Sequence, residues 1–295
     1  MTANEFYARI ERFAPMKYSE EFCSRYGAYD NSGLLINCKN NVQAAAFSLD
    51  LSEEAVEFAV QNGAGAIVTH HPAIYAKLSS LCPGEGEGGA VLAAARAGIS
   101  VISMHLNLDA AEGGIDERLA CGVRKAAIAA ARAESAESAE GAEGGAVENG
   151  AETGVRAARG EEKMYAFSCG DGGYGRAYDV AECSAQRLKE EFDKEFGAKH
   201  TLLFAKDGRK IKRVCSFCGA GADEEALAFA VKNGADLIVS SDIKHHILKE
   251  ILSRGMAALC PTHYAAEAYG FNEFYKKIAG AAEVPCIYFG NDSLL

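Results

Sequence analysis

The sequence predicts an α/β protein of two similar lobes with largely parallel sheets, joined by an acidic low-complexity linker. Short β-branched runs alternate with helical periods of about ten residues, which is typical of βαβ units. One helix-and-strand pattern occurs twice along the chain, and a segment without aromatic residues lies between the copies. These observations together favour two lobes of the same design.

The domain boundaries follow from length and composition. A chain of 295 residues is about twice the length of a typical domain. Residues 133–154 contain six glutamates and no basic residue, and they offer no apolar stripe to bury. We therefore expect a first lobe over 1–130, a disordered or loosely helical Ala/Glu/Gly linker over 131–163, and a second lobe over 164–295.

The elements of the first lobe follow in order. Residues 44–51 resemble a strand, and Ser52 is suited to cap a helix that has glutamates in its first turn. Asn62 and Gly63 end this helix. The expected elements that follow are a buried strand at 66–69, a helix at 90–97 and a strand at 100–104.

The second lobe repeats this order. Residues 53–64 match 224–235 at a constant offset of 171, and the strand at 66–69 corresponds to 237–240. A second helix then ends at a glycine in each copy, and a strand follows that leads to a histidine. The repeat therefore predicts that both lobes place a histidine at an equivalent strand end.

Composition and net charge argue against several classes of protein. The formal net charge of −11 argues against nucleic acid or an anionic membrane as a partner. No run approaches the length of a transmembrane helix, and the charged N-terminal segment differs from a signal peptide. The ten cysteines are scattered, mostly in apolar runs, as in reduced proteins. We expect a cytoplasmic protein that acts on a small-molecule substrate.

The histidines provide the strongest indication of chemistry. His70 and His71 follow one strand directly, and their rings can converge only if the chain turns there, where Pro72 favours an extended His71 just past the strand end. His105 and His263 follow two further strands. Because ligands bind at the carboxyl ends of strands in open α/β sheets, these positions predict a metal site rather than four separate structural histidines.

Two carboxylates complete the candidate ligand set. Asp109 lies four residues after His105, and Glu267 lies four residues after His263, a spacing that puts both members of a pair on one helix face. Imidazoles mixed with carboxylates suit Zn, Mn or Fe, and six ligands exceed the need of one tetrahedral ion. We expect two divalent metal ions bridged by a carboxylate.

Three further residues are candidates for the same pocket. Asp242, His245 and His246 lie at or just beyond the repeat position of the first histidine pair. The sequence leaves two roles open for them: substrate contacts or proton shuttles in the same pocket, and a surface or capping role, which any exposed histidine can have.

Several motifs resemble one known family. They are Asp30-Asn31-Ser32-Gly33-Leu34, Thr69-His70-His71-Pro72, the stretch from His105 to Gly114, Ser241-Asp242-Ile243-Lys244-His245-His246, and Thr262-His263-Tyr264-Ala265-Ala266-Glu267. Apart from the linker, the whole chain resembles the GTP cyclohydrolase I type 2 homologs, also called dinuclear metal-centre hexameric proteins.

This resemblance implies a two-lobed subunit in a toroidal homohexamer. It also implies a two-metal site formed by His70, His71, Asp109, His263 and Glu267, with His105 close enough to take part. Two functions then remain open. One is a metal-dependent hydrolase that acts on a nucleotide such as GTP. The other is a non-catalytic metal carrier or regulator, which needs the same ligands.

Overall fold

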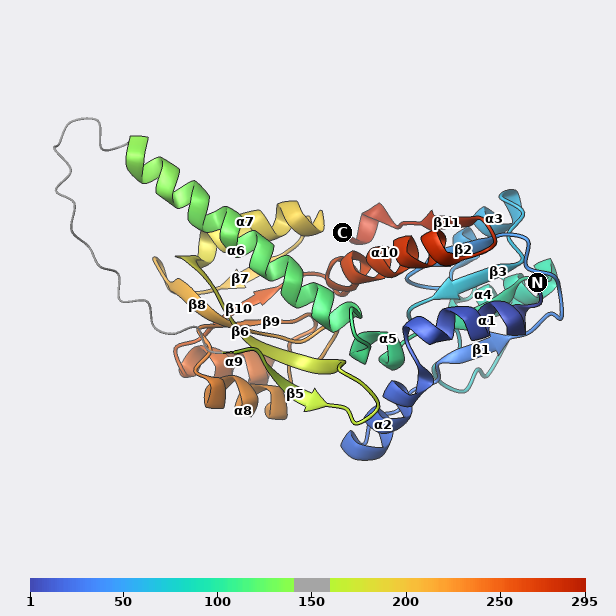
Figure 1. The fold of residues 1–295 in the computed structure, drawn as a ribbon, viewed down its shortest axis with the longest axis horizontal. Helices are drawn as coiled ribbons and strands as arrows, with labels where there is room; N and C mark the ends of the chain where they lie inside the picture. Colours follow the sequence, from blue (N-terminus) through green and yellow to red (C-terminus); the bar gives the residue numbers. More distant parts are fainter. Residues whose placement is uncertain (141–159) are drawn as a thin grey trace. The chain divides into compact units, whose positions relative to one another are not determined.

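The computed structural model describes residues 1–140 and 160–295, which form two compact units (Figure 1). The first unit consists of Met1–Glu117, Ala166–Gly173 and Glu267–Leu294. The second unit consists of Arg118–Tyr165 and Tyr174–Ala266, with Leu295.

The first unit is built on a five-stranded sheet in the order β1-β4-β3-β2-β11. Its strands are β1 (Gly33–Ile36), β2 (Ala45–Ser48), β3 (Ala66–Thr69), β4 (Ser100–Ser103) and β11 (Cys286–Phe289). The four strands from β4 to β11 are parallel, and β1 is antiparallel to β4. Its helical segments are α1 (Ala3–Ile10), the 3-10 turns η1 (Glu11–Phe13) and η2 (Asp292–Leu294), α2 (Met16–Tyr26), α3 (Glu53–Gln61), α4 (Gly86–Ala97), α5 (Leu106–Ala110) and most of α10 (His263–Ala281).

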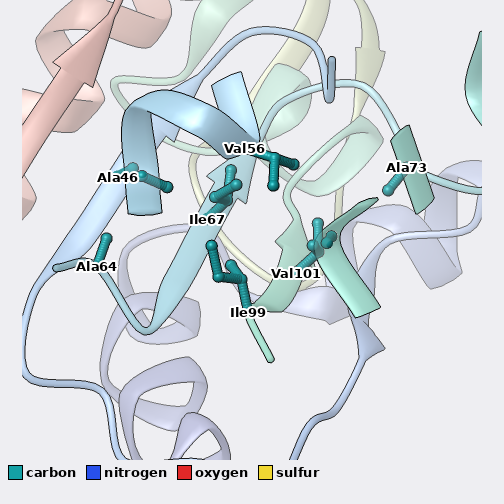
Figure 2. Packing of buried hydrophobic residues seen from close by; sticks show 9 residues of the cluster. Ala46, Val56, Ala64, Ile67, Ala73, Ile99 and Val101 are labelled. Carbon is teal, nitrogen blue, oxygen red and sulfur yellow. The ribbon is translucent and has the colours of Figure 1, made fainter. Parts of the chain in front are cut away.

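Both faces of this sheet are covered. Because successive strand residues point to opposite faces, Ala46, Ile67 and Val101 share one face, where they pack with Val56 of α3 and Ala94 of α4 (Figure 2). On the other face the aromatic ring of Phe47 lies 5.4–6.3 Å, centroid to centroid, from three rings of α10, those of Phe271, Phe274 and Tyr275. Helix α10 is thus fixed against the sheet by its aromatic side chains.

The second unit contains a six-stranded sheet in the order β5-β6-β8-β9-β10-β7. Its strands are β5 (Glu162–Ala166), β6 (Gly173–Ser184), β7 (Leu202–Phe204), β8 (Lys210–Ser216), β9 (Leu237–Val239) and β10 (Ala257–Cys260). Strands β8, β9 and β10 are parallel, whereas β6 and β7 are antiparallel to their neighbours β8 and β10. Its helices are α7 (Ala185–Phe196), α8 (Glu224–Asn233) and α9 (His245–Ser253), and it also contains most of α6 (Ile115–Glu140).

The predicted fold class and its repeat are confirmed. The order β1-β4-β3-β2 in the first sheet is matched by β7-β10-β9-β8 in the second, including the antiparallel edge strand next to the last parallel one. Equivalent helices begin at equivalent caps, because Ser52 accepts the Ala55 N–H ahead of α3 and Asp223 accepts the Ala226 N–H ahead of α8. The repeat thus includes edge strands that the sequence comparison did not align.

The compact units differ from the predicted lobes at several boundaries, because 118–130 lie in the second unit and 166–173 and 267–294 lie in the first. Residues 267–294 were assigned with the second lobe, yet they belong to the first unit. The reason is that β11 pairs in parallel with β2, with Cys286 opposite Ala45. A pairing between strands about 240 residues apart leaves no local pattern in the sequence.

Part of the predicted linker is helical. Helix α6 continues to Glu140, ten residues beyond the expected lobe boundary at 130. The carboxylate of Glu134 accepts hydrogen bonds from the Ser184 N–H and from the Lys210 ammonium, both at 2.7 Å. These polar contacts anchor a part of the helix that has few apolar side chains to bury. Residues 141–159 lie outside the described part of the chain, and the linker prediction stays a prediction there.

A membrane-spanning helix was also not expected. Over the described ranges, none of the helices combines the length and the apolar character that a bilayer crossing requires.

Candidate metal centre

The candidate ligands of the first unit lie at one edge of its sheet. Strands β2, β3 and β4 are parallel, so their carboxyl ends meet at the same edge. Asp50 follows β2, the pair His70–His71 follows β3, and His105 follows β4. This edge is where parallel α/β sheets usually bind ligands.

A tight turn brings the two adjacent histidines together. The N–H groups of His70 and His71 both donate to the carbonyl of Leu49, at 3.1 and 3.0 Å. The hydroxyl of Thr69 donates to the carbonyl of His71 at 2.8 Å. The strand alternation is broken at this point, and the two ring centroids lie 4.9 Å apart. The chain therefore bends at this point, as convergence of the two rings requires.

His70 is a fully buried imidazole with one nitrogen left for a ligand. Its Nδ1 lies 2.8 Å from the carbonyl oxygen of Met104, and because a carbonyl only accepts, Nδ1 carries the hydrogen. The Nε2 atom then has a lone pair, and it makes no hydrogen bond within the described residues. It lies 3.5 Å from a carboxylate oxygen of Asp109 and 3.5 Å from one of Glu267.

This arrangement is unfavourable without a cation. Leaving a buried acceptor unsatisfied costs about 1–3 kcal/mol. Asp109 and Glu267 are only 4% and 2% exposed, and burying a carboxylate costs several kcal/mol unless opposite charge is near, a cost that the charged His71 beside Glu267 offsets in part. A divalent ion bound to Nε2 would offset both costs, so the residues present fit a metal.

His71 lies between two carboxylates. Its Nδ1 is 2.6 Å from Asp50, and its Nε2 is 2.9 Å from Glu267. Burial alone would lower the pKa of this imidazole, but the two carboxylates favour its charged form and raise the pKa of His71 to about 10. The proton on Nε2 thus occupies a position that suits a metal ion.

His105 is oriented by a buried aspartate. Its Nδ1 lies 2.9 Å from the carboxylate of Asp30. Burial alone would raise the pKa of Asp30, but hydrogen bonds from His105, Ser19 and Ser32 lower it to about 2. Asp30 therefore stays ionised and fixes the ring of His105. The ring centroid of His105 lies 5.2 Å from that of His70.

Two groups in the first unit have the spacing of metal ligands. Their donor atoms lie within 4.8 Å of one another, and the groups are His70 with His71 and Glu267, and His70 with His105 and Asp109. We call these five residues the histidine cluster. Three imidazoles and two carboxylates are a donor set suited to Zn, Mn or Fe.

In the second unit, His263 shows the same hydrogen-bonding pattern. Its Nδ1 lies 2.5 Å from a carboxylate oxygen of Asp242, which adopts the left-handed backbone conformation with φ of +50°. His263 is the first residue of α10, one helical turn ahead of Glu267. The placement of His263 in the same site as the histidine cluster stays a prediction.

The other pocket candidates lie on the surface of the second unit. His245 and His246 are exposed in the first turn of α9, and His246 contacts the exposed carboxylate of Glu224 at 3.3 Å. Asp242 is exposed as well, and it holds His263. The expected substrate or proton-shuttle role of these three residues stays a prediction.

Sequence reasoning did not assign the residues that orient the rings. Asp50, Asp30 and the carbonyl of Met104 each meet the Nδ1 of a histidine distant in sequence. Asp50 follows the carboxyl end of β2, beside the strand that leads to His71, which is the only local sign of its role. Asp30 begins a conspicuous motif, but nothing in the motif indicates its contact with His105.

Comparisons with known proteins place this chain in a family context. The GTP cyclohydrolase 1 type 2 homolog of Lactococcus lactis is 24% identical over 273 residues, which cover 91% of this chain and 88% of that protein. The NIF3-like protein 1 of Drosophila melanogaster is 24% identical over 282 residues, covering 95% of this chain and 82% of that protein.

Solved structures show the same fold. A Staphylococcus aureus hypothetical protein superposes with a TM-score of 0.75 at 18% identity, covering 99% of this chain and 97% of that one. Reduced HcgD from Methanocaldococcus jannaschii superposes with a TM-score of 0.68 at 20% identity, covering 99% and 98%. The resemblance drawn from the sequence motifs is confirmed at the family level. A model of the Duf34/NIF3 (NGG1p interacting factor 3) family matches residues 1–290, and the chain belongs to this family.

Proposed function

We propose that this protein binds two divalent metal ions and uses them to hydrolyse a nucleotide such as GTP. One observation carries the metal assignment: His70, His71, His105 and His263 each direct Nδ1 to a carbonyl or carboxylate oxygen. This is the usual arrangement of metal-binding histidines, because the acceptor fixes the ring and leaves Nε2 for the ion. We propose Zn, Mn or Fe as the metal.

The ligands divide into two sets, and His70 is close to the donor atoms of both. His70, His71 and Glu267 would hold one ion, and His105 and Asp109 would hold the other, with a carboxylate bridging the two. We propose His263 as a further ligand because it lies one turn before Glu267 on α10. Asp30, Asp50 and Asp242 would orient the rings without binding the ions themselves.

The chain's own residues would supply the rest of the chemistry. Bound divalent ions would provide Lewis acidity toward water and substrate at neutral pH. With Nε2 of His71 on the ion, the Asp50 carboxylate would hold the Nδ1 proton of that ring, and Asp50, about half exposed, can exchange protons with solvent. If the substrate is a purine nucleotide, the attacked atom would be C8, in the five-membered ring of the purine base. The support for a nucleotide is the name that several relatives carry, GTP cyclohydrolase 1 type 2 homolog.

The setting of this activity is also part of the proposal. We propose a cytoplasmic homohexamer that takes a small-molecule substrate and binds neither nucleic acid nor membrane. The family resemblance supports the hexamer, and the net charge of −11 supports the absence of polyanionic partners.

The first prediction concerns metal content. His70→Ala removes a donor shared by both candidate groups, so bound metal should fall from about two ions per chain to one or none. Asp109→Asn, which keeps the side-chain size, should also lower it. Elemental analysis after desalting measures the content, and His200→Ala, an exposed histidine, is the control. If the wild-type protein stays metal-free after incubation with excess metal, the proposed metal site is wrong.

The second prediction concerns protons. The raised pKa of His71, about 10, means that the metal-free site is protonated at pH 8. Because imidazole binds metal only when it is deprotonated, loading at pH 8 should release about one proton from His71. Calorimetry in buffers of different ionisation enthalpy measures this release. Asp50→Asn should reduce it, and the absence of proton release from the wild type would contradict the prediction.

The same shift affects the stability of the metal-free protein. A pKa raised in the folded state stabilises it fully below the unfolded value of about 6.5. This contribution should decline as the pH rises and be lost once the pH passes about 10.

The third prediction concerns turnover. Metal-loaded protein should release a hydrolysed product from GTP or another nucleotide, and chelation should abolish the reaction. Chromatography of reaction mixtures over a nucleotide panel measures turnover, with the Asp109→Asn variant as the control for contaminating enzymes. Stoichiometric metal binding without any turnover would instead support the carrier or regulator.

A further inference from the structure

Two exposed tyrosines of the first unit stand out among the aromatic residues. The chain has 14 phenylalanines, 12 tyrosines and no tryptophan, and all of these rings fall within the described ranges. Only Tyr29 and Tyr75, at 59% and 43% exposure, are classed as exposed. Large aromatic side chains are normally buried for their apolar area, so an exposed pair calls for a function.

The two rings form a pair beside the histidine cluster. Their centroids lie 5.3 Å apart with an interplanar angle of 76°, an edge-to-face contact. The ring of Tyr75 also meets that of His105 edge to face, with centroids 6.2 Å apart. An edge-to-face pair leaves ring faces uncovered, and these can accept another flat ring.

The loops that carry the two tyrosines are tied to the cluster. Tyr29 precedes Asp30, the residue that orients His105. Tyr75 follows Ile74, whose carbonyl accepts the side-chain amide of Asn31 at 2.5 Å. One hydrogen bond therefore joins the two loops and holds the tyrosine pair at a fixed place next to a candidate ligand.

We propose that Tyr29 and Tyr75 form a stacking surface for the planar heteroaromatic base of a nucleotide that reacts at the histidine cluster. This inference rests on the proposed function and adds a binding subsite to it. Stacking on an aromatic side chain suits any base, because every base has a π face. The tyrosine rings carry no charge, so they are suited to the base and not to the phosphates.

Binding measurements on the metal-loaded full-length protein test this inference. Tyr29→Ala and Tyr75→Ala should each weaken GTP binding about five- to tenfold in calorimetry and leave the binding of inorganic triphosphate unchanged. Phenylalanine at either position keeps the ring face and should restore GTP affinity to within about twofold of the wild type. Leu81→Ala removes an exposed side chain of the same unit and serves as the control. Metal content should stay at the wild-type value in all variants.

The outcomes separate this inference from the function on which it rests. GTP binding that is equally tight in both alanine variants would overturn the stacking surface and leave the proposed function intact. A wild-type protein that binds metal but no nucleotide would overturn both. If the alanine variants change the oligomeric state in light scattering while GTP affinity per chain is retained, the pair is a contact between copies and the inference is wrong.

Discussion

The hydrogen bond between the Nδ1 atom of each candidate ligand histidine and its acceptor oxygen orients the imidazole rings of the candidate centre. An imidazole has two nitrogens, and the group that holds one of them decides where the other points. In the first unit this group is a backbone carbonyl for His70 and a carboxylate for His71 and for His105. The Nε2 atoms therefore point toward the space that Asp109 and Glu267 also face. The carboxylates of Asp50 and Glu267, one at each nitrogen of the ring, explain why the pKa of His71 is raised.

The parallel sheet positions the donors and acceptors of these hydrogen bonds. Parallel pairing brings the ends of β2, β3 and β4 to one edge, so residues far apart in sequence supply both the rings and their acceptors. Beneath the rings, the hydroxyls of Thr69 and Ser103 lie 2.8 Å apart, and the Ser103 hydroxyl accepts the Ala73 N–H at 3.0 Å. These contacts tie the turn at His70–His71 to the neighbouring strand. The candidate centre is therefore held by rigid secondary structure rather than by loops alone.

The sequence was sufficient for the features that local patterns encode. Strand ends and helix caps predicted where the histidines lie, because each depends on neighbouring residues, and the repeat is visible because two segments match at one constant offset. The acceptors Asp30 and Asp50 could not be assigned, since their partners lie 75 and 21 residues away and no period connects them. The same reason applies to β11, which pairs with β2 about 240 residues earlier in the chain. Helix α6 continues beyond its last apolar residues because Glu134 accepts hydrogen bonds from Ser184 and Lys210. Composition alone cannot reveal these two contacts.

The position of a bound ion tests the central claim most directly. Crystals of the metal-loaded protein, with anomalous diffraction recorded at the absorption edge of the metal, would locate each ion and its ligands. The account predicts an ion about 2.0–2.1 Å from the Nε2 atom of His70, with Nδ1 still facing the carbonyl of Met104. An ion bound elsewhere, with His70 Nε2 more than about 3 Å from any metal, would contradict it.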